Sequence, residues 1–506
     1  MPTRPILIGA AVLLLAAAAC MCAPTLAGEP GAPKTDANPP APAAPADPPP
    51  STGALTPGPC PFEFGAYDID CGTLTVPERH ANPDGPTLEL AVAILRSPNR
   101  APDPIVYLAG GPGGSAIWEV DIWLATPYVQ TRDVILIDQR GTGFSSPTLN
   151  CPEEEEGQSN AVDRCYRRLR SEGIDLAAFN SAESAADVEM LRQALGIAEW
   201  NVVGVSYGTR LALTLMRDHG AAGGIRSVVL DSPYAPEVDA YTEQGVNTLR
   251  AFDVLLDGCA ADPACSAAYP DLRETFYRLL VELEANPVDF TAYDPEYDET
   301  IDYTLTGYDL LSEVFLAMYN TGDIPYLPKM IADIDRGDYT LIGDLYLGYW
   351  LGDSYIDLVD DVFFPDEDIS DSEGFFYSVE CYEEEPFSDL AASLDLMAAY
   401  PPDIVELAQY DAEDFDFTCR TWDVGAAGSI EDQPVVSDIP TLILAGEYDP
   451  VTPPVWGEVA ERSLTNDLLL IFPGVGHAAI ASGPCPESIV LDFLAAGSVA
   501  GQDTSC

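Results

Sequence analysis

Residues 200–210, Trp-Asn-Val-Val-Gly-Val-Ser-Tyr-Gly-Thr-Arg, constrain the fold of this chain more than any other segment. An apolar run leads into a Gly-x-Ser-x-Gly turn, and the helix-forming stretch 211–217 follows it. This order predicts a strand, a sharp turn and a helix, with Ser206 at the apex as a candidate nucleophile. Gly204 and Gly208 fit a strained turn with closely packed neighbours, because a Cβ at either position would clash. The alternative is an ordinary strand-to-helix turn that contains a serine.

A nucleophilic serine needs a base, and the chain has three histidines. His80 lies in a polar turn upstream of the other candidate catalytic residues. His219 ends the helix after Ser206, where the helix dipole favours a histidine without any catalytic role. His477 follows the apolar run 468–472 in a loop made pliable by two glycines. We therefore expect His477 to be the base.

The acid that orients this base should lie between nucleophile and base in the chain, directly after a strand. Asp449 follows the apolar run 441–445 and meets both conditions. Paired with His477, it would fix the imidazole tautomer and stabilise the imidazolium that forms when Ser206 loses its proton. Glu447 is the rival carboxylate, and the place of Asp449 in the loop after the strand favours Asp449.

A glycine-rich loop supplies candidate donors for a developing oxyanion. The apolar run 105–109 leads into Gly-Gly-Pro-Gly-Gly-Ser at 110–115, where the backbone can approach a substrate closely. The amides of Tyr207 and Gly111 are the expected donors. The alternative is a phosphate cradle, but the loop lacks the Lys-Ser/Thr ending of a nucleotide-binding loop.

Five motifs together resemble one family. They are Gly-Gly-Pro-Gly-Gly-Ser at 110–115, Asp-Gln-Arg-Gly-Thr-Gly at 138–143, Gly-Val-Ser-Tyr-Gly at 204–208, Tyr-Asp-Pro-Val-Thr-Pro at 448–453 and Gly-His at 476–477. The set resembles α/β-hydrolases of the prolyl iminopeptidase and tripeptidyl aminopeptidase group. The resemblance covers about residues 60–506 and is looser over 236–425, where such enzymes carry a variable cap.

The resemblance implies an aminopeptidase that removes short pieces, proline or di- and tripeptides, from peptide N-termini without a cofactor or metal. Ala109 departs from the histidine usual in prolyl iminopeptidases, which favours the secreted tripeptidyl aminopeptidase-like members. Ser-Val-Glu-Cys-Tyr-Glu at 378–383 is similar to the cysteine-plus-acid segment of the family's cap. Glu383 is therefore the candidate that reads the free substrate amine. The alternative is a solvated acidic run formed by residues 383–385.

The N-terminal residues predict export. Arg4 precedes an apolar core too short for a spanning helix, which indicates a signal peptide over 1–27. Ala-Ala-Ala-Cys20 resembles a lipoprotein box and predicts cleavage after Ala19, with a lipid on Cys20; ordinary cleavage after Ala27 is the alternative. Residues 28–59 are rich in Pro, Ala, Gly and Asp, which predicts a disordered tether. We expect an extracellular, periplasmic or cell-surface protein.

Ten cysteines lie beyond Cys22, and an even number in an exported chain predicts disulfides. Neither a Cys-x-x-Cys pair nor more than three histidines is present, so a zinc site is not expected. The expected partners are Cys60 with Cys71, Cys151 with Cys165, Cys259 with Cys265, Cys381 with Cys419, and Cys485 with Cys506.

The formal net charge is −61, from 83 acidic and 22 basic residues. A charge of this sign and size repels nucleic acid and anionic lipid, so a nucleic-acid function is excluded and membrane attachment is expected only through Cys20. The acidic runs 153–156 and 366–368 lack the spaced ligands and glycine of a calcium loop. We expect them to be solvated surface.

Apolar runs alternate with helical segments, which predicts a mostly parallel α/β sheet flanked by helices. The expected strands are 88–95, 105–109, 134–137, 201–205, 227–230, 441–445 and 468–472. A helix is expected over 184–195, with Gly196 as its stop. The fold class is therefore an α/β-hydrolase fold with a core over 60–235 and 426–506. A largely helical cap over 236–425 is inserted after the fifth or sixth core strand and should cover the site.

Together these features predict a serine hydrolase acting on peptide substrates. Two other functions stay open at this point. An esterase or lipase on the same scaffold would use the same triad, and an inactive binding protein would keep the fold without the chemistry.

Overall fold

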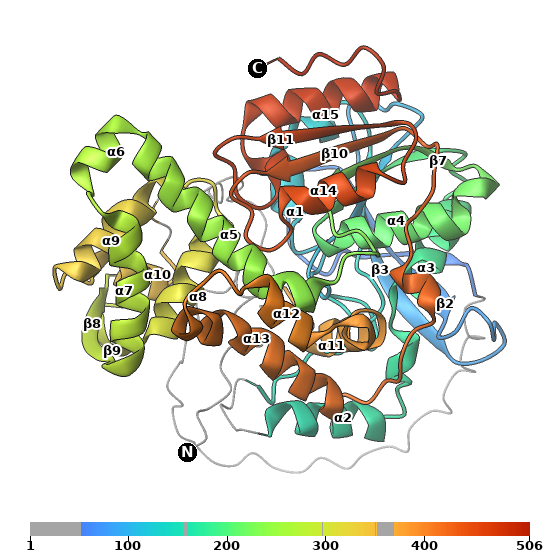
Figure 1. Cartoon of the computed structure of the whole chain (residues 1–506). Helices are drawn as coiled ribbons and strands as arrows, with labels where there is room; N and C mark the ends of the chain where they lie inside the picture. The colour runs from blue at the N-terminus through green and yellow to red at the C-terminus, as the bar shows by residue number, and fades with distance from the viewer. Residues whose placement is uncertain (1–51, 155–159, 296, 350, 352–368, 506) are drawn as a thin grey trace, which may run out of the picture.

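A twisted sheet forms the centre of the molecule (Figure 1). The computed structural model describes residues 52–154, 160–295, 297–349, 351 and 369–505. The nine strands lie in the order β1-β2-β3-β5-β4-β6-β7-β10-β11, antiparallel from β1 to β5 and parallel from β5 to β11. The strands are β1 (Leu55–Gly58), β2 (Ile69–Pro77), β3 (Thr87–Leu95), β4 (Ile105–Leu108), β5 (Val134–Ile137), β6 (Trp200–Val205), β7 (Ile225–Asp231), β10 (Thr441–Gly446) and β11 (Asp467–Phe472).

Helices cover both faces of this sheet. Side chains alternate along each strand, so Val202 packs in one core with α3 and α4, whereas Val203 packs in another with α1 and α15. Burial on both faces explains why the central strands read as continuous apolar runs. The core helices are α1 (Val120–Ala125), α2 (Ala161–Ser171), α3 (Ser181–Ala194), α4 (Tyr207–His219), α14 (Pro454–Glu461) and α15 (Pro484–Ala496).

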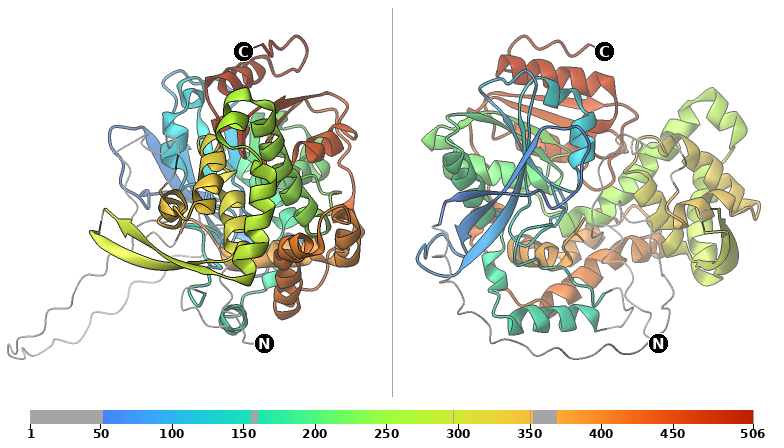
Figure 2. Two further views of the ribbon diagram at one scale, coloured as in Figure 1. Left: turned by 60° about the vertical axis from the view of Figure 1, so that its left-hand side comes forward. Right: turned by 180° about the vertical axis from the view of Figure 1, so that it is seen from behind.

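An insertion between β7 and β10 forms the cap. Part of it has its own hydrophobic core, built mainly from α5 and α7–α9, and an antiparallel hairpin, β8 with β9, lies at the outer edge of this part (Figure 2). The other part, α11–α13, lies along the core beside α2 (Figure 1). The cap elements are α5 (Ala240–Ala261), α6 (Pro263–Ala268), α7 (Leu272–Ala285), β8 (Val288–Asp294), β9 (Glu299–Leu305), α8 (Gly307–Ala317), α9 (Leu327–Asp335), α10 (Thr340–Tyr346), α11 (Glu373–Glu383), α12 (Leu390–Leu396) and α13 (Pro402–Thr421).

The mostly parallel sheet, all seven expected strands and the largely helical cap are confirmed. Helix α3 ends at Ala194, just before Gly196, which adopts a φ of +65°. The insertion follows β7, which is the fifth of the expected core strands and, with β1 and β2 included, the seventh strand along the chain. Strands β1 and β2 precede the predicted strands and were not predicted from the sequence. Their residues are a mixture of polar and apolar ones, as suits a half-exposed sheet edge, and so form no clear apolar run.

The predicted tether is wrong at its C-terminal end. Leu55–Gly58 forms the edge strand β1, which pairs antiparallel with β2. The amide of Gly53 also donates to the carbonyl of Thr75. A proline such as Pro57 is tolerated on an edge strand because one side of the strand needs no hydrogen-bond donors. The signal peptide, Cys20 and the tether up to residue 51 lie outside the described residues.

Four of the expected disulfides are present: Cys60–Cys71, Cys151–Cys165, Cys259–Cys265 and Cys381–Cys419. The predicted pairing of Cys485 with Cys506 involves a residue outside the described ones. Disulfides at this density are typical of proteins in an oxidising, exported environment. No helix in the described parts of the chain is both long and apolar enough to cross a membrane.

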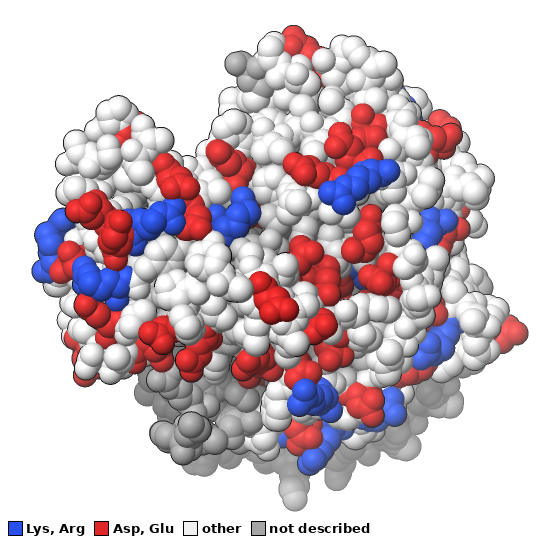
Figure 3. Space-filling model, in the orientation of Figure 1, with Lys and Arg blue, Asp and Glu red and all other residues white. Residues whose placement is uncertain are grey.

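Acidic side chains are spread over the surface, and basic ones lie next to them (Figure 3). In the cap, for example, Arg273 pairs with both Asp253 and Asp257. Of the acidic run at 153–156, Glu153 pairs with Arg168, and Glu154 accepts a hydrogen bond from the hydroxyl of Tyr377. The run 366–368 and residues 155–156 lie outside the described residues.

The disulfide between α11 and α13 should stabilise the fold more than the one at the end of α5. Cys381–Cys419 closes a loop of 38 residues, whereas Cys259–Cys265 closes one of 6. Restriction of the unfolded chain gives about 4 kcal/mol for the first and about 2 kcal/mol for the second. Urea denaturation of the two double Cys→Ser variants would measure this. Equal losses of unfolding free energy would contradict the expectation.

Candidate active site

The carboxyl ends of the parallel strands meet at one edge of the sheet, and the predicted catalytic residues follow them. Ser206 comes directly after β6, Asp449 after β10 and His477 after β11. The Gly110–Ser115 loop follows β4 at the same edge. In open α/β sheets this edge is where ligands bind.

The turn at Ser206 is strained and tightly enclosed. Ser206 has a φ of +55° and a ψ of −125°, a backbone conformation that costs a residue with a side chain about 1–3 kcal/mol. A Cβ on Gly204 would lie 2.3 Å from the carbonyl oxygen of Gly208. A Cβ on Gly208 would lie 2.0 Å from the carbonyl oxygen of Leu108. The expected steric need for both glycines is confirmed.

The structure joins His477 to Asp449 and not to the rival carboxylate. His477 Nδ1 lies 2.8 Å from Asp449 Oδ2. Glu447 instead accepts a hydrogen bond from the amide of Gly474. The hydroxyl of Thr452 donates to Asp449 Oδ2 at 2.8 Å and lies 3.3 Å from His477 Nδ1. The amides of Val451 and Thr452 donate to Asp449 Oδ1 at 3.0 and 2.9 Å. Both carboxylate oxygens are therefore fixed.

These contacts set the charges of the pair. Burial opposes ionisation of Asp449, but the attraction of His477 and the hydrogen bonds from His477 and Thr452 outweigh it and lower the pKa of this carboxyl. Burial would likewise lower the pKa of His477, but Asp449 and the more distant Asp231 raise it above its ordinary value. The pair is thus arranged to stabilise an imidazolium once His477 has taken a proton.

Asp231 connects the turn at Ser206 to the loop that contains His477. Its carbonyl accepts a hydrogen bond from the amide of Ser206 at 2.9 Å. Its carboxylate accepts from the amides of Ala479 and Ile480 at 2.9 and 2.8 Å. Burial raises the pKa of Asp231 to about 7, although these amides and His477 oppose the shift. One residue at the end of β7 therefore holds both segments.

The glycine-rich loop lies against Ser206. A Cβ on Gly110 would lie 3.1 Å from the Cβ of Ser206. Gly111 adopts a φ of +107°, which few residues other than glycine tolerate. From the next strand end, Asp138 accepts hydrogen bonds from the hydroxyl of Ser115 and the amide of Ile117 at 2.8 and 3.0 Å. Asp138 thus holds the C-terminal end of the loop in place. The roles of the Gly111 and Tyr207 amides as oxyanion donors stay predictions.

The cap contacts both His477 and Asp449. The ring of Tyr319, just beyond α8, lies 4.9 Å from the imidazole of His477 between centroids, and its carbonyl accepts from the amide of His477 at 3.1 Å. The guanidinium of Arg250 on α5 donates to the carbonyls of Glu447 and Asp449 at 3.1 and 2.5 Å. The expectation that the cap lies over the catalytic loops agrees with these contacts.

Glu383, the predicted reader of a substrate amine, is buried at the end of α11. Ser181 donates to its two carboxylate oxygens, from the amide and from the hydroxyl, each at 2.6 Å. Burial raises the pKa of Glu383, while Arg210 and Ser181 act in the opposite direction. A substrate ammonium could bind Glu383 only if these internal contacts were given up. The solvated-run alternative is wrong for Glu383 and Glu384, which are both buried.

The other two histidines lie away from Ser206, in places that a structural role explains. His80 Nε2 lies 2.7 Å from Asp187 Oδ1, and Asp187 is held from its other side by the buried guanidinium of Arg140. His219 is the last residue of α4, as expected. Neither belongs to the strand-end cluster that contains Ser206.

Several residues of the site were missed at the level of sequence. Thr452 and Asp138 lie within motifs that mark the resemblance, and Asp231 directly follows the expected strand 227–230, so a signal for each was present in the sequence. No local pattern pointed to Arg250, Tyr319 or Ser181, because each of them contacts residues that are far away in the sequence. In the described parts of the chain, no group of three His, Cys, Asp or Glu side chains could hold a metal ion.

Comparison with known proteins places the chain among hydrolases. The family described as alpha/beta hydrolase fold matches residues 103–484. The chain is 26% identical to carboxylesterase B of Mycobacterium tuberculosis over 86% of each chain, and 23% identical to serine protease Hip1 of the same species over 86% of this chain and 87% of that one. It is 30% identical to tripeptidyl aminopeptidase of Streptomyces lividans, over 34% of this chain and 36% of that one.

Replacing Asp231 should move the pH dependence of the reaction. The negative charge of Asp231 raises the pKa of His477, and a base must be neutral to act. Asp231→Asn should therefore shift the acidic limb of the kcat/KM profile to lower pH. Glu380→Gln is the matched control, because the pKa of this buried carboxyl is also raised to about 7 but it faces Tyr234 and Tyr241. An acidic limb that stays in place in Asp231→Asn, or moves upward, would contradict the assignment.

Proposed function

The chain belongs to the alpha/beta hydrolase fold family, and from that premise we propose that it is a serine aminopeptidase that releases short N-terminal pieces from peptides. One observation carries the catalytic part of the proposal. The hydrogen bond of 2.8 Å between His477 Nδ1 and Asp449 Oδ2 lies at the same sheet edge as the strained turn of Ser206. Nucleophile, acid and base follow one another along the chain in the order typical of this fold.

In the first half of the reaction, Ser206 Oγ attacks the carbonyl carbon of the scissile bond while His477 Nε2 accepts its proton. Asp449 stabilises the resulting imidazolium through Nδ1. The carbonyl oxygen becomes an oxyanion, for which the amides of Gly111 and Tyr207 are the proposed donors. Collapse of this intermediate breaks the bond to the leaving group, which takes the proton from His477 and departs as an amine. The acyl group stays on Ser206.

In the second half, His477 removes a proton from water, and the hydroxide attacks the acyl carbon. The second tetrahedral intermediate breaks its bond to Ser206 Oγ, which regains a proton from His477. A carboxylic acid leaves, and the enzyme is restored. This sequence needs only groups of the chain and water.

Two features favour peptides with a free N-terminus as substrates. The motifs resemble those of the tripeptidyl aminopeptidase group, and two relatives are named serine protease and tripeptidyl aminopeptidase. The net charge of −61 also creates a field that attracts a cationic ammonium group and repels anionic substrates. The internal partners of Glu383 mean that the proposal does not depend on this carboxylate as the amine ligand.

An esterase is the second candidate function, because one relative is named carboxylesterase B and the same triad cleaves esters. A binding protein without catalytic activity is the third candidate. It is disfavoured because every position of the triad is filled by a residue that can do the chemistry.

We further propose that the protein is exported, with Cys20 as a lipid anchor. The four disulfides support an oxidising compartment. The N-terminal sequence supports the export signal, and mass spectrometry of the mature N-terminus would distinguish a lipid on Cys20 from cleavage after Ala27.

Replacing the nucleophile should abolish turnover and leave the fold intact. Ser206→Ala removes the attacking oxygen, so kcat should fall by about four to six orders of magnitude, while circular dichroism and thermal unfolding stay near those of the wild type. A fluorophosphonate probe should label the wild type and not the variant. Near-full activity of the variant, or an unlabelled wild type, would refute the serine mechanism.

The substrate class is tested with three matched compounds: a short peptide amide with a free amine, its N-acetylated copy and a simple ester of the same acyl group. An aminopeptidase should cleave the free-amine peptide at least about tenfold more efficiently than the blocked copy, because it gains a charge-assisted contact with the ammonium. The measurement is kcat/KM for each compound at one ionic strength. Equal values for blocked and free peptides, or a strong preference for the ester, would favour the esterase.

A further inference from the structure

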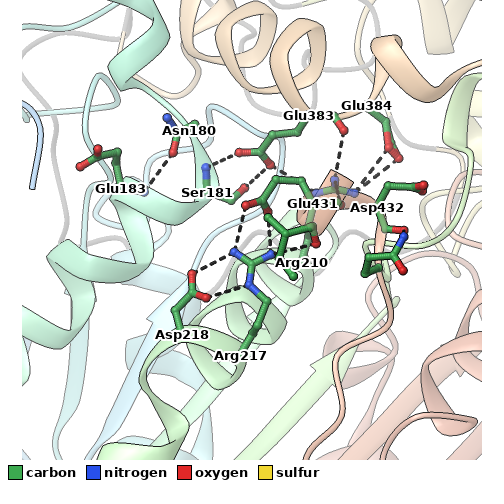
Figure 4. A network of polar contacts seen from close by, with 12 residues as sticks. Asn180, Ser181, Glu183, Arg210, Arg217, Asp218, Glu383, Glu384, Glu431 and Asp432 are labelled. Carbon is green, nitrogen blue, oxygen red and sulfur yellow. Dashed lines mark hydrogen bonds and ion pairs between the residues drawn. The ribbon is translucent and has the colours of Figure 1, made fainter. Parts of the chain in front are cut away.

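A buried polar network joins the cap to the helix that begins at the nucleophile (Figure 4). Glu383 and Glu384 extend from the end of α11, and Arg210 extends from the first turn of α4. Arg210 Nε lies 3.4 Å from the carboxylate of Glu383, and Nη1 lies 3.4 Å from that of Glu384. All three side chains are nearly free of contact with solvent. The cap is therefore fixed to α4 through ionic groups that cannot easily be released into water.

Of these two carboxylates, Glu383 is linked by further hydrogen bonds to the residue next to Ser206. Ser181, the first residue of α3, donates to Glu383 from its amide and its hydroxyl. The same hydroxyl lies 2.9 Å from the hydroxyl of Tyr207. Tyr207 is the residue directly after Ser206, and its ring is completely buried against Phe375 of α11. The chain of contacts therefore runs from Glu383 through Ser181 to Tyr207.

This series of contacts ends at Tyr207, whose backbone amide the proposed reaction uses. Tyr207 carries one of the two amides proposed to bind the oxyanion, and it shares a peptide bond with the strained Ser206. A strained conformation persists only where surrounding contacts over-determine it. The packing and hydrogen bonding of the Tyr207 ring provide such contacts, because they hold the side chain of the first residue of α4 in place.

We propose that Glu383 is a positioning residue that holds the Ser206–Tyr207 turn in its reactive geometry through Ser181, and that it does not bind the substrate amine. This inference rests on the proposed serine mechanism. Because Glu383 supports the catalytic geometry, it should affect the rate with every substrate alike. Part of the oxyanion site is then built by the cap.

Glu383→Gln tests the proposal on one ester and one free-amine peptide amide. The amide nitrogen of the new side chain cannot accept the hydrogen bond from Ser181, and it faces Arg210. We expect kcat to fall by about ten- to a hundredfold on both substrates, by a similar factor, with KM changed less than about threefold. The second-order rate of labelling by a fluorophosphonate should fall by a comparable factor, because it needs the same nucleophile and oxyanion donors.

Glu384→Gln is the matched control. Glu384 is buried in the same network and contacts the same guanidinium, yet it makes no hydrogen bond to Ser181 or Tyr207 within the described residues. Its variant should keep kcat within about threefold of the wild type. Equal losses in Glu383→Gln and Glu384→Gln would overturn the proposal in favour of a general effect of the buried charges.

Tyr207→Phe keeps the backbone amide and removes only the hydroxyl at the end of the chain of contacts. It should lower kcat as well, and combining it with Glu383→Gln should cost little more than Glu383→Gln alone, because both changes break one chain. Additive effects would overturn the proposal. Tyr207→Phe also keeps the test open if Glu383→Gln fails to fold, which thermal unfolding would reveal.

An increase of KM confined to free-amine substrates, with kcat and ester hydrolysis unchanged, would assign Glu383 to amine binding and refute a positioning role. Failure of the proposed function looks different: the wild type would then hydrolyse neither compound and would not react with the fluorophosphonate. A reactive wild type with fully active Glu383→Gln and Tyr207→Phe variants would refute only the inference about Glu383.

Discussion

The close packing of backbone around Ser206 is the constraint on which the rest of the site depends. The carbonyl of Leu108 leaves no room for a Cβ at Gly208, so α4 begins in direct contact with the end of β4. The amide of Ser206 is held by the carbonyl of Asp231, which ends β7. The turn cannot relax without moving one of these strands. Strain at the nucleophile is therefore maintained by a sheet that is buried on both faces and resists deformation.

The cap contributes to this rigidity at three separate points. Arg250 binds the carbonyls of the acid loop, Tyr319 packs on the imidazole of His477, and Glu383 reaches Tyr207 through Ser181. Each contact comes from a different helix or helix end of the insertion. The core thus supplies the three residues of the proposed triad, whereas the cap supplies part of their surroundings. A cap that only covered the site would not need to contact all three catalytic segments.

Much of this arrangement could be predicted from the sequence because it depends on local signals. The seven strands read as apolar runs, and the chain order identified Asp449 and His477, which the structure joins by a hydrogen bond at the sheet edge that Ser206 also follows. The role of Ser206 as nucleophile stays a prediction. Strands β1 and β2 escaped detection because their half-exposed residues carry a weaker pattern. The surroundings of Glu383 could not be predicted, since Ser181 lies 202 residues earlier in the chain. Sequence indicates an acidic residue there, but only the fold reveals that its oxygens are already occupied.

Three buried carboxylates of α11 and its end surround a guanidinium of the helix that begins after Ser206. Glu380, Glu383 and Glu384 share the surroundings of a single guanidinium, Arg210, and burial raises the pKa of all three. Arg210 leaves α4 one turn after Ser206, and its guanidinium lies over the ring of Tyr234. Glu383 differs from the other two because it accepts a hydrogen bond from Ser181, which also contacts Tyr207. Glu384 contacts the guanidinium, and Glu380 accepts from the hydroxyls of Tyr234 and Tyr241. In the proposed mechanism amide and ester cleavage use the same triad, so a change at Glu383 that alters the geometry at Ser206 should act on both reactions.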